Sequence, residues 1–207
     1  MIKNNHPDEV IQSMYLEITN IAQGVNIALL AYIVTSEVFI SGGWYDFITH
    51  FSLALTSLFI CVLFWIRYYL DTRILYRSFT VLSVIWYFLY ITFQGISITF
   101  INQPVAWLVS TGFFLLFGAG FYQLNLNEIK RKKAFQVLEA LPEYEAWQKR
   151  RLVELSVMAF VSFAGAWLVK YGLLPYLLAS WVALAASIWQ LVLCRDYRKL
   201  NFINTGV

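Results

Sequence analysis

Residues 124–155, LNLNEIKRKKAFQVLEALPEYEAWQKRRLVEL, form the one long and densely charged stretch of this sequence. The stretch holds seven of the fifteen Lys and Arg residues and five of the twelve Asp and Glu residues. The chain as a whole has 60% hydrophobic and only 13% charged residues over 207 positions. Such a composition lies outside the range of soluble domains and predicts a protein that folds in a lipid bilayer.

Six apolar segments surround the charged stretch, four before it and two after it. A helix needs about 20 apolar residues to cross roughly 30 Å of hydrocarbon, and it satisfies its backbone hydrogen bonds internally. We therefore expect an all-α integral membrane protein with about six transmembrane helices, at residues 18–40, 47–66, 79–101, 104–124, 152–170 and 174–194. In this division, residues 1–17 are a leader, 125–151 a charged helical segment and 195–207 a tail.

The positions of the cations predict the orientation of these spans. If all six segments cross the membrane, fourteen of the fifteen Lys and Arg residues lie on one side, and Lys170 alone lies on the other. Positive loops stay in the cytoplasm, so we expect both termini to be cytoplasmic. The small size and short loops favour a bacterial inner-membrane protein. The net charge of +3 reflects topology, and we expect membrane lipids rather than nucleic acid as the contact of these cations.

Residues that could perform catalysis are scarce. The chain has two histidines, His6 and His50, and it lacks the HExxH, CxxC, GxSxG and Walker patterns. We therefore expect no enzyme activity, no cofactor and no metal. One weak alternative is the set Glu37, Asp46 and His50 near the outer surface, which either forms an interfacial hydrogen bond or senses pH or binds a divalent ion.

The first predicted span carries polar side chains at helical spacing. An unpaired amide facing lipid costs several kcal/mol, so these side chains should face protein or water. They either line a pore or solute path or form hydrogen bonds between helices. The residues are Glu17, Asn20, Gln23 and Asn26.

Small residues recur every four positions in the last span, at Ala179, Ala183 and Ser187. Ser162 and Ala166 repeat the pattern in the span before it. Small side chains let helix backbones approach closely in lipid. This face therefore predicts either contact between the last two spans of one chain or the interface of a homo-oligomer.

The charged stretch itself predicts a cytoplasmic amphipathic elbow between spans four and five. A helix over residues 127–141 should end before Pro142, which suits the first turn of a second helix. The elbow either rests on anionic lipid or binds a cytoplasmic protein, for which aromatic side chains among charges are typical anchors. The candidate partner-binding residues are Lys130, Arg131, Lys132, Lys133, Tyr144, Trp147, Lys149 and Arg150.

These observations favour a non-enzymatic membrane subunit that oligomerises and recruits or regulates a cytoplasmic partner protein. The alternative is an ion channel or small-solute transporter that uses the polar face of the first span. In size and layout the chain is similar to the membrane components of bacterial anti-phage defence systems such as Kiwa. The similarity is one of layout, and no motif of this chain corresponds to theirs residue by residue.

Overall fold

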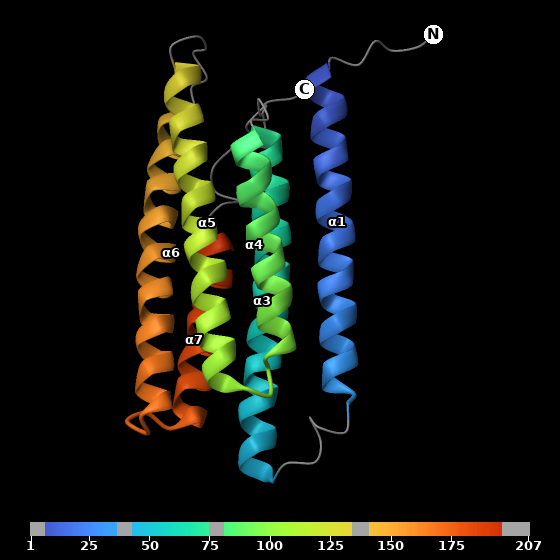
Figure 1. Ribbon diagram of the computed structural model, residues 1–207. Helices are drawn as coiled ribbons and strands as arrows, with labels where there is room; N and C mark the ends of the chain where they lie inside the picture. The colour runs from blue at the N-terminus through green and yellow to red at the C-terminus, as the bar shows by residue number, and fades with distance from the viewer. Residues whose placement is uncertain (1–6, 37–42, 75–80, 134–140, 196–207) are drawn as a thin grey trace.

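The structure is a computed structural model that describes residues 7–36, 43–74, 81–133 and 141–195. These residues form six α-helices joined by short connections (Figure 1). The helices are α1 (Pro7–Val34), α3 (Trp44–Ile74), α4 (Val81–Thr99), α5 (Pro104–Lys133), α6 (Leu141–Lys170) and α7 (Tyr176–Arg195).

The helices run alternately up and down in one bundle (Figure 1). α6 packs against α5 along most of its length, α5 packs against α4, and α1 covers α3 and α4. α7 packs chiefly against α3 and makes few contacts with α6. The start of α1 therefore lies at the same end of the bundle as the end of α5 and the start of α6, and α7 runs towards this end (Figure 1).

Five of the helices are long and apolar enough to cross a membrane, which confirms the predicted class of helical membrane protein. The apolar segments are Leu16–Val34, Trp44–Arg67, Pro104–Asn127, Glu145–Lys170 and Tyr176–Leu193. The expected third span at 79–101 corresponds to α4, whose 19 residues include the shorter apolar part Val84–Thr99 among the described residues, so a sixth span stays a prediction. α4 ends at Thr99 because a turn formed by residues 100–103 leads directly into α5 at Pro104.

The charged stretch does not begin with a separate helix at residue 127. α5 continues without a break from its apolar part to Lys133, and α6 runs from Leu141 into its own apolar part. Pro142 does occupy the first turn of α6, as its missing N–H group favours. Residues 134–140, where the expected elbow would turn, lie outside the described part of the chain.

The boundaries of the outer spans also shift. α1 begins at Pro7, but its apolar segment, Leu16–Val34, begins close to the expected residue 18 and ends before the expected residue 40. Between α6 and α7, Gly172 adopts a positive φ of 71°. Its N–H donates to the carbonyl of Val169 at 3.0 Å, and the N–H of Leu173 donates to Leu168 at 2.9 Å. This closure of the helix end favours glycine, because a side chain at positive φ is strained.

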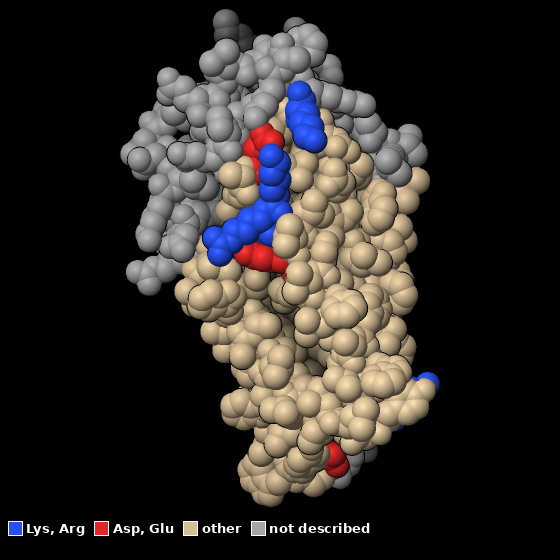
Figure 2. All heavy atoms as spheres, turned by 90° about the vertical axis from the view of Figure 1, so that its left-hand side faces the viewer, with Lys and Arg blue, Asp and Glu red and all other residues tan. Residues whose placement is uncertain are grey.

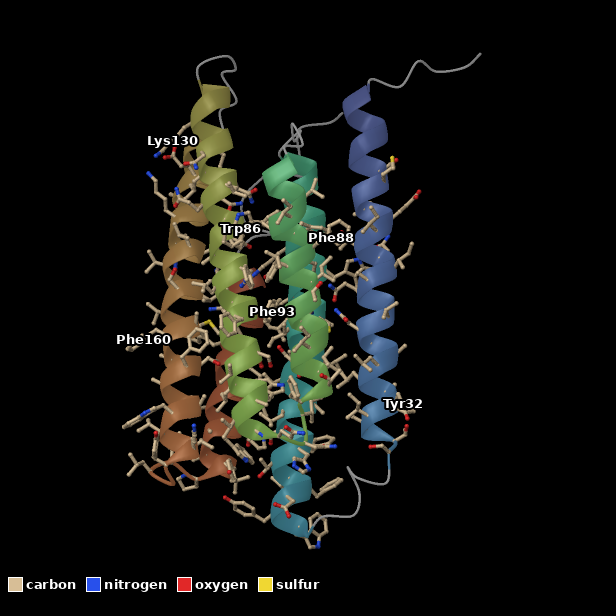
Figure 3. The ribbon with its side chains drawn as sticks, in the orientation of Figure 1. Tyr32, Trp86, Phe88, Phe93, Lys130 and Phe160 are labelled. Carbon is tan, nitrogen blue, oxygen red and sulfur yellow. The ribbon has the colours of Figure 1, made fainter. Side chains whose placement is uncertain are left out.

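Aromatic rings of α4 fill the space against α5. Trp86 lies between the two helices (Figure 3) and packs edge-on against Phe117, with ring centroids 5.4 Å apart. Tyr90 stacks on Phe114 at 4.5 Å. A Cβ atom at Gly120 of α5 would lie 2.5 Å from the Trp86 ring. The absence of a side chain at this position therefore permits the observed approach of α4 to α5.

We predict that Gly120→Ala lowers the free energy of unfolding of the purified protein by about 1–3 kcal/mol, the usual cost of overpacking. The Trp86 ring would have to move to accept the new methyl group. Unfolding in a mixed-detergent titration measures the change.

The matched control is Gly24→Ala in α1, where a new Cβ atom meets nothing within 4 Å. This substitution should leave stability unchanged or raise it slightly, because alanine is the better helix former. Equal stability of Gly120→Ala and Gly24→Ala would contradict the close contact between α4 and α5.

Candidate functional site

A buried polar cluster joins α3, α6 and α7 near the charged end of the bundle. The carboxamide oxygen of Gln190 accepts hydrogen bonds from Arg67 Nη2 at 2.5 Å and from Arg151 Nη1 at 2.8 Å. Arg151 also forms an ion pair with Glu154, and Gln190 Nε2 donates to the same carboxylate at 3.4 Å. We call Arg67, Arg151, Glu154 and Gln190 the arginine cluster.

Burial makes the arginine cluster unusual. Arg67, Arg151 and Gln190 are exposed by only 7%, 2% and 7%. A buried guanidinium group is stable only when its N–H groups have polar partners, and its planar, weakly hydrated shape suits such sites. The cluster therefore connects three helices, and each of its buried polar groups needs the others as hydrogen-bond partners.

An elongated cavity of about 170 Å³ extends from the arginine cluster towards the opposite end of the bundle. Side chains of α3, α5, α6 and α7, with Tyr90 of α4, line it, and most of them are apolar. Gln190 and Arg67 lie at one end of the cavity, and Trp107 and Ala179 line it further along. Gln190 and Ala179 are eleven positions apart in α7, so the cavity follows this helix for roughly 16 Å.

The cavity reaches the outer surface between α6 and α7. Val161 of α6 and Val182 of α7 both line it, and both are about half exposed. Figure 2 shows this face of the bundle, with the charged side chains gathered near one end and a hollowed apolar surface below them. This surface belongs to segments long and apolar enough to cross a membrane.

The Thr111 hydroxyl differs from the other polar groups in the cavity wall. Thr111 is 5% exposed, and its hydroxyl has no hydrogen-bond partner among the described residues. The neighbouring Ser110 hydroxyl instead donates to the carbonyls of Ala106 and Trp107. A buried hydroxyl without a partner contributes little to stability, so Thr111 serves below as a reference position.

The sequence matches no protein family. No curated protein and no solved structure is significantly similar to it either. The interpretation of the site therefore rests on the chemistry and geometry of its own side chains.

The polar residues of the first span divide into two pairs. Gln23 and Asn26 are buried, and each donates a hydrogen bond to the Gln94 carboxamide oxygen of α4, at 2.9 Å and 3.2 Å. Gln94 Nε2 donates in turn to Gln23 at 3.3 Å and to the Cys61 sulfur at 3.2 Å. This arrangement favours hydrogen bonding between helices over the lining of a pore.

The other pair faces outward. Glu17 and Asn20 are exposed, and the side-chain oxygen of Asn20 accepts a hydrogen bond from the Trp65 indole of α3 at 2.8 Å. The four residues therefore do not form one continuous polar face.

The charged turns of α5 and α6 carry exposed cations. Lys130 is exposed near the end of α5 (Figure 3), and Lys149 and Arg150 are exposed on α6. Lys149 pairs with Glu145 at 2.8 Å, and Arg150 pairs with Glu154 at 2.9 Å. The side chains of Arg131, Lys132, Lys133 and Tyr144 lie outside the described part of the structure.

Trp147, one of the candidate partner-binding residues, is not a fully exposed side chain, and its role in partner binding stays a prediction. Its ring is half-buried and packs edge-on against Tyr122 of α5, with centroids 5.9 Å apart. The Arg151 guanidinium lies 5.2 Å from the centroid of the same ring. Trp147 is half-buried because α5 and α6 pack against each other at this level, so its aromatic side chain meets Tyr122 of α5.

The small residues of α7 face the interior of the chain. Ala179 and Ser187 are buried, and both line the cavity together with Ala183. Ser162 and Ala166 of α6 are also buried, and the Ser162 hydroxyl donates to the Leu108 carbonyl of α5 at 2.8 Å. The expected close contact between the last two spans is replaced by a cavity, and an oligomer interface at this face stays a prediction.

The structure describes only part of the set Glu37, Asp46 and His50, which was expected near the outer surface. Asp46 is exposed, His50 is half-buried, and Glu37 lies outside the described residues. Within the described ranges no three His, Cys, Asp or Glu side chains form a group that could hold a metal ion.

Our sequence analysis did not identify Arg67, Gln94, Arg151 and Gln190 as site residues. The available signal was the isolated glutamine in two apolar segments, at Gln94 and Gln190. A polar side chain in such a segment requires a partner on another helix. The sequence does not show which partner is chosen, because that depends on how the helices pack.

We predict that Gln94→Leu lowers the free energy of unfolding by about 1–3 kcal/mol, because the buried amides of Gln23 and Asn26 lose their shared acceptor. Asn20→Leu should have a smaller effect, since Asn20 is exposed. Detergent unfolding of the purified variants measures the difference.

Thr111→Val provides the matched control, because it removes a buried polar group that has no hydrogen-bond partner among the described residues. Its stability should equal or exceed that of the parent. If Gln94→Leu is as stable as Thr111→Val, the amide network does not hold α1 to α4.

Proposed function

We propose that this chain is a non-enzymatic integral membrane subunit that binds a cytoplasmic partner protein through the charged end of α5 and α6. The observation that supports this proposal most strongly is that both charged turns continue membrane-spanning helices without a break. The two helices also pack together where these turns join the apolar segments, at the contact between Trp147 and Tyr122. A partner bound at this end would therefore act on the bundle directly.

A series of side-chain contacts along α6 also supports the proposal. Arg150 is exposed and pairs with Glu154, and Glu154 in turn belongs to the arginine cluster. A partner that competes for Arg150 would disturb the environment of Glu154, and through it Arg151 and Gln190. This chain of contacts gives a physical route from the docking surface to α3 and α7.

The proposed orientation places this end and both termini in the cytoplasm of a bacterial cell, with the bundle in the inner membrane. The basis is that nearly all cations fall on one side of the membrane when the apolar segments cross it. Oligomerisation and a role in an anti-phage defence system belong to the same proposal and rest on the small residues and on layout alone. The channel alternative is less favoured, because Gln23 and Asn26 are hydrogen-bonded to Gln94.

We predict that neutralising the exposed cations reduces partner binding. A tagged chain carrying Lys130→Gln, Lys149→Gln and Arg150→Gln, gently extracted from its native membrane, should recover about tenfold less of a stoichiometric cytoplasmic protein than the parent. Charges at the edge of an interface mainly accelerate association, so the difference should shrink at high salt. Quantitative mass spectrometry of the copurified proteins measures the recovery.

Lys170→Gln is the matched control, since Lys170 is an exposed lysine at the opposite end of the bundle. It should leave recovery unchanged. Trp147→Ala should reduce both partner recovery and stability, whereas the triple variant should reduce recovery alone. Equal recovery with the triple variant and the parent would rule out docking at these cations.

A further inference from the structure

The cavity beside the arginine cluster has an apolar lining that has no role in the proposed partner docking. Its wall is almost entirely apolar, and its volume of about 170 Å³ is similar to that of a protein cavity of about 150 Å³ that binds benzene. Apolar cavities of this size do not hold water readily. The space therefore suits part of a hydrocarbon chain.

The opening of the cavity indicates where such a chain comes from. Val161 and Val182 line the cavity and are also about half exposed on the apolar outer surface between α6 and α7. An acyl chain can thus enter sideways from the bilayer, with the rest of the lipid remaining among its neighbours. The few contacts between α6 and α7 leave this side of the bundle open.

The polar end of the cavity indicates the kind of headgroup. Arg67 and Gln190 line this end, and Arg151 is hydrogen-bonded to the same glutamine. The described side chains of the arginine cluster comprise two guanidinium groups and one carboxylate, that of Glu154, which also pairs with the exposed Arg150. A guanidinium has five N–H donors in a planar fork, so it can hold a carboxamide and a phosphate oxygen together.

We propose that the cavity binds one anionic phospholipid from the leaflet at the charged end of α5 and α6. One acyl chain lies between α6 and α7, and the phosphate contacts Arg67, which lines the polar end of the cavity. This site goes beyond the proposed docking function and does not depend on it, because it requires only that the bundle lies in a bilayer. A lipid bound here connects α3, α6 and α7 through the arginine cluster.

The test uses the full chain, purified in a neutral detergent and depleted of lipid. Thermal unfolding is followed while phosphatidylglycerol, phosphatidylcholine or soluble glycerol phosphate is added. A ligand that binds only the folded state raises the unfolding temperature, and the rise grows with the logarithm of its concentration above the dissociation constant. We expect phosphatidylglycerol to raise it at concentrations at least tenfold lower than phosphatidylcholine, and glycerol phosphate to have no effect.

Two variants address the two parts of the lipid. Ala183→Phe fills the cavity from α7, and Arg67→Gln removes one cation from its polar end. Each should raise the concentration of phosphatidylglycerol needed for a given rise in unfolding temperature at least tenfold. Ala185→Phe is the matched control, because Ala185 is exposed on α7 and does not line the cavity.

Equal responses of the parent to phosphatidylglycerol and phosphatidylcholine would overturn the proposal, as would a response to glycerol phosphate alone. A folded Ala183→Phe variant with the parent's response would also overturn it. If Ala183→Phe does not fold, the comparison of the three additives on the parent and the response of Arg67→Gln still decide the outcome.

Discussion

Inside a bilayer a polar side chain must find its hydrogen-bond partners within the protein, and two glutamines of this chain show the consequence. Gln94 of α4 accepts from Gln23 and Asn26 of α1, and Gln190 of α7 accepts from Arg67 of α3 and Arg151 of α6. Because lipid offers no competing partners, these contacts select which helices lie together. The aromatic packing between α4 and α5 then completes the bundle.

The need for hydrogen-bond partners within the protein links the exposed cations of α6, the arginine cluster and the cavity. α6 presents Lys149 and Arg150 to the outside, and its next residue, Arg151, is buried in the arginine cluster. The cluster forms the polar end of the cavity, which opens on an apolar surface between α6 and α7. Partner binding and lipid binding would therefore act on one set of side chains. By linkage, a partner and a lipid that share this cluster must change each other's affinity if either alters its geometry.

The sequence was sufficient for the fold class, since composition and the length of apolar segments depend on single helices. It also identified the polar character of Gln23 and Asn26. It did not reveal that Trp147 is half-buried or that Ala179 and Ser187 face a cavity, because both depend on which helix lies opposite. Small residues permit close packing without ensuring it, and α7 packs on α3 rather than on α6. The helical continuation of α5 to Lys133 was missed because charge was taken to mark the end of a helix.

The central claim is that the bundle crosses the membrane with its charged end in the cytoplasm. Labelling of single cysteines with an impermeant thiol reagent on intact cells tests it most directly, in a background where Cys61 and Cys194 are replaced. A cysteine at the exposed position Gln103, between α4 and α5, should react from outside. A cysteine at the exposed position Ala146 of α6 should react only after the membrane is permeabilised. Labelling at Ala146 in intact cells, with Gln103 protected, would contradict the account.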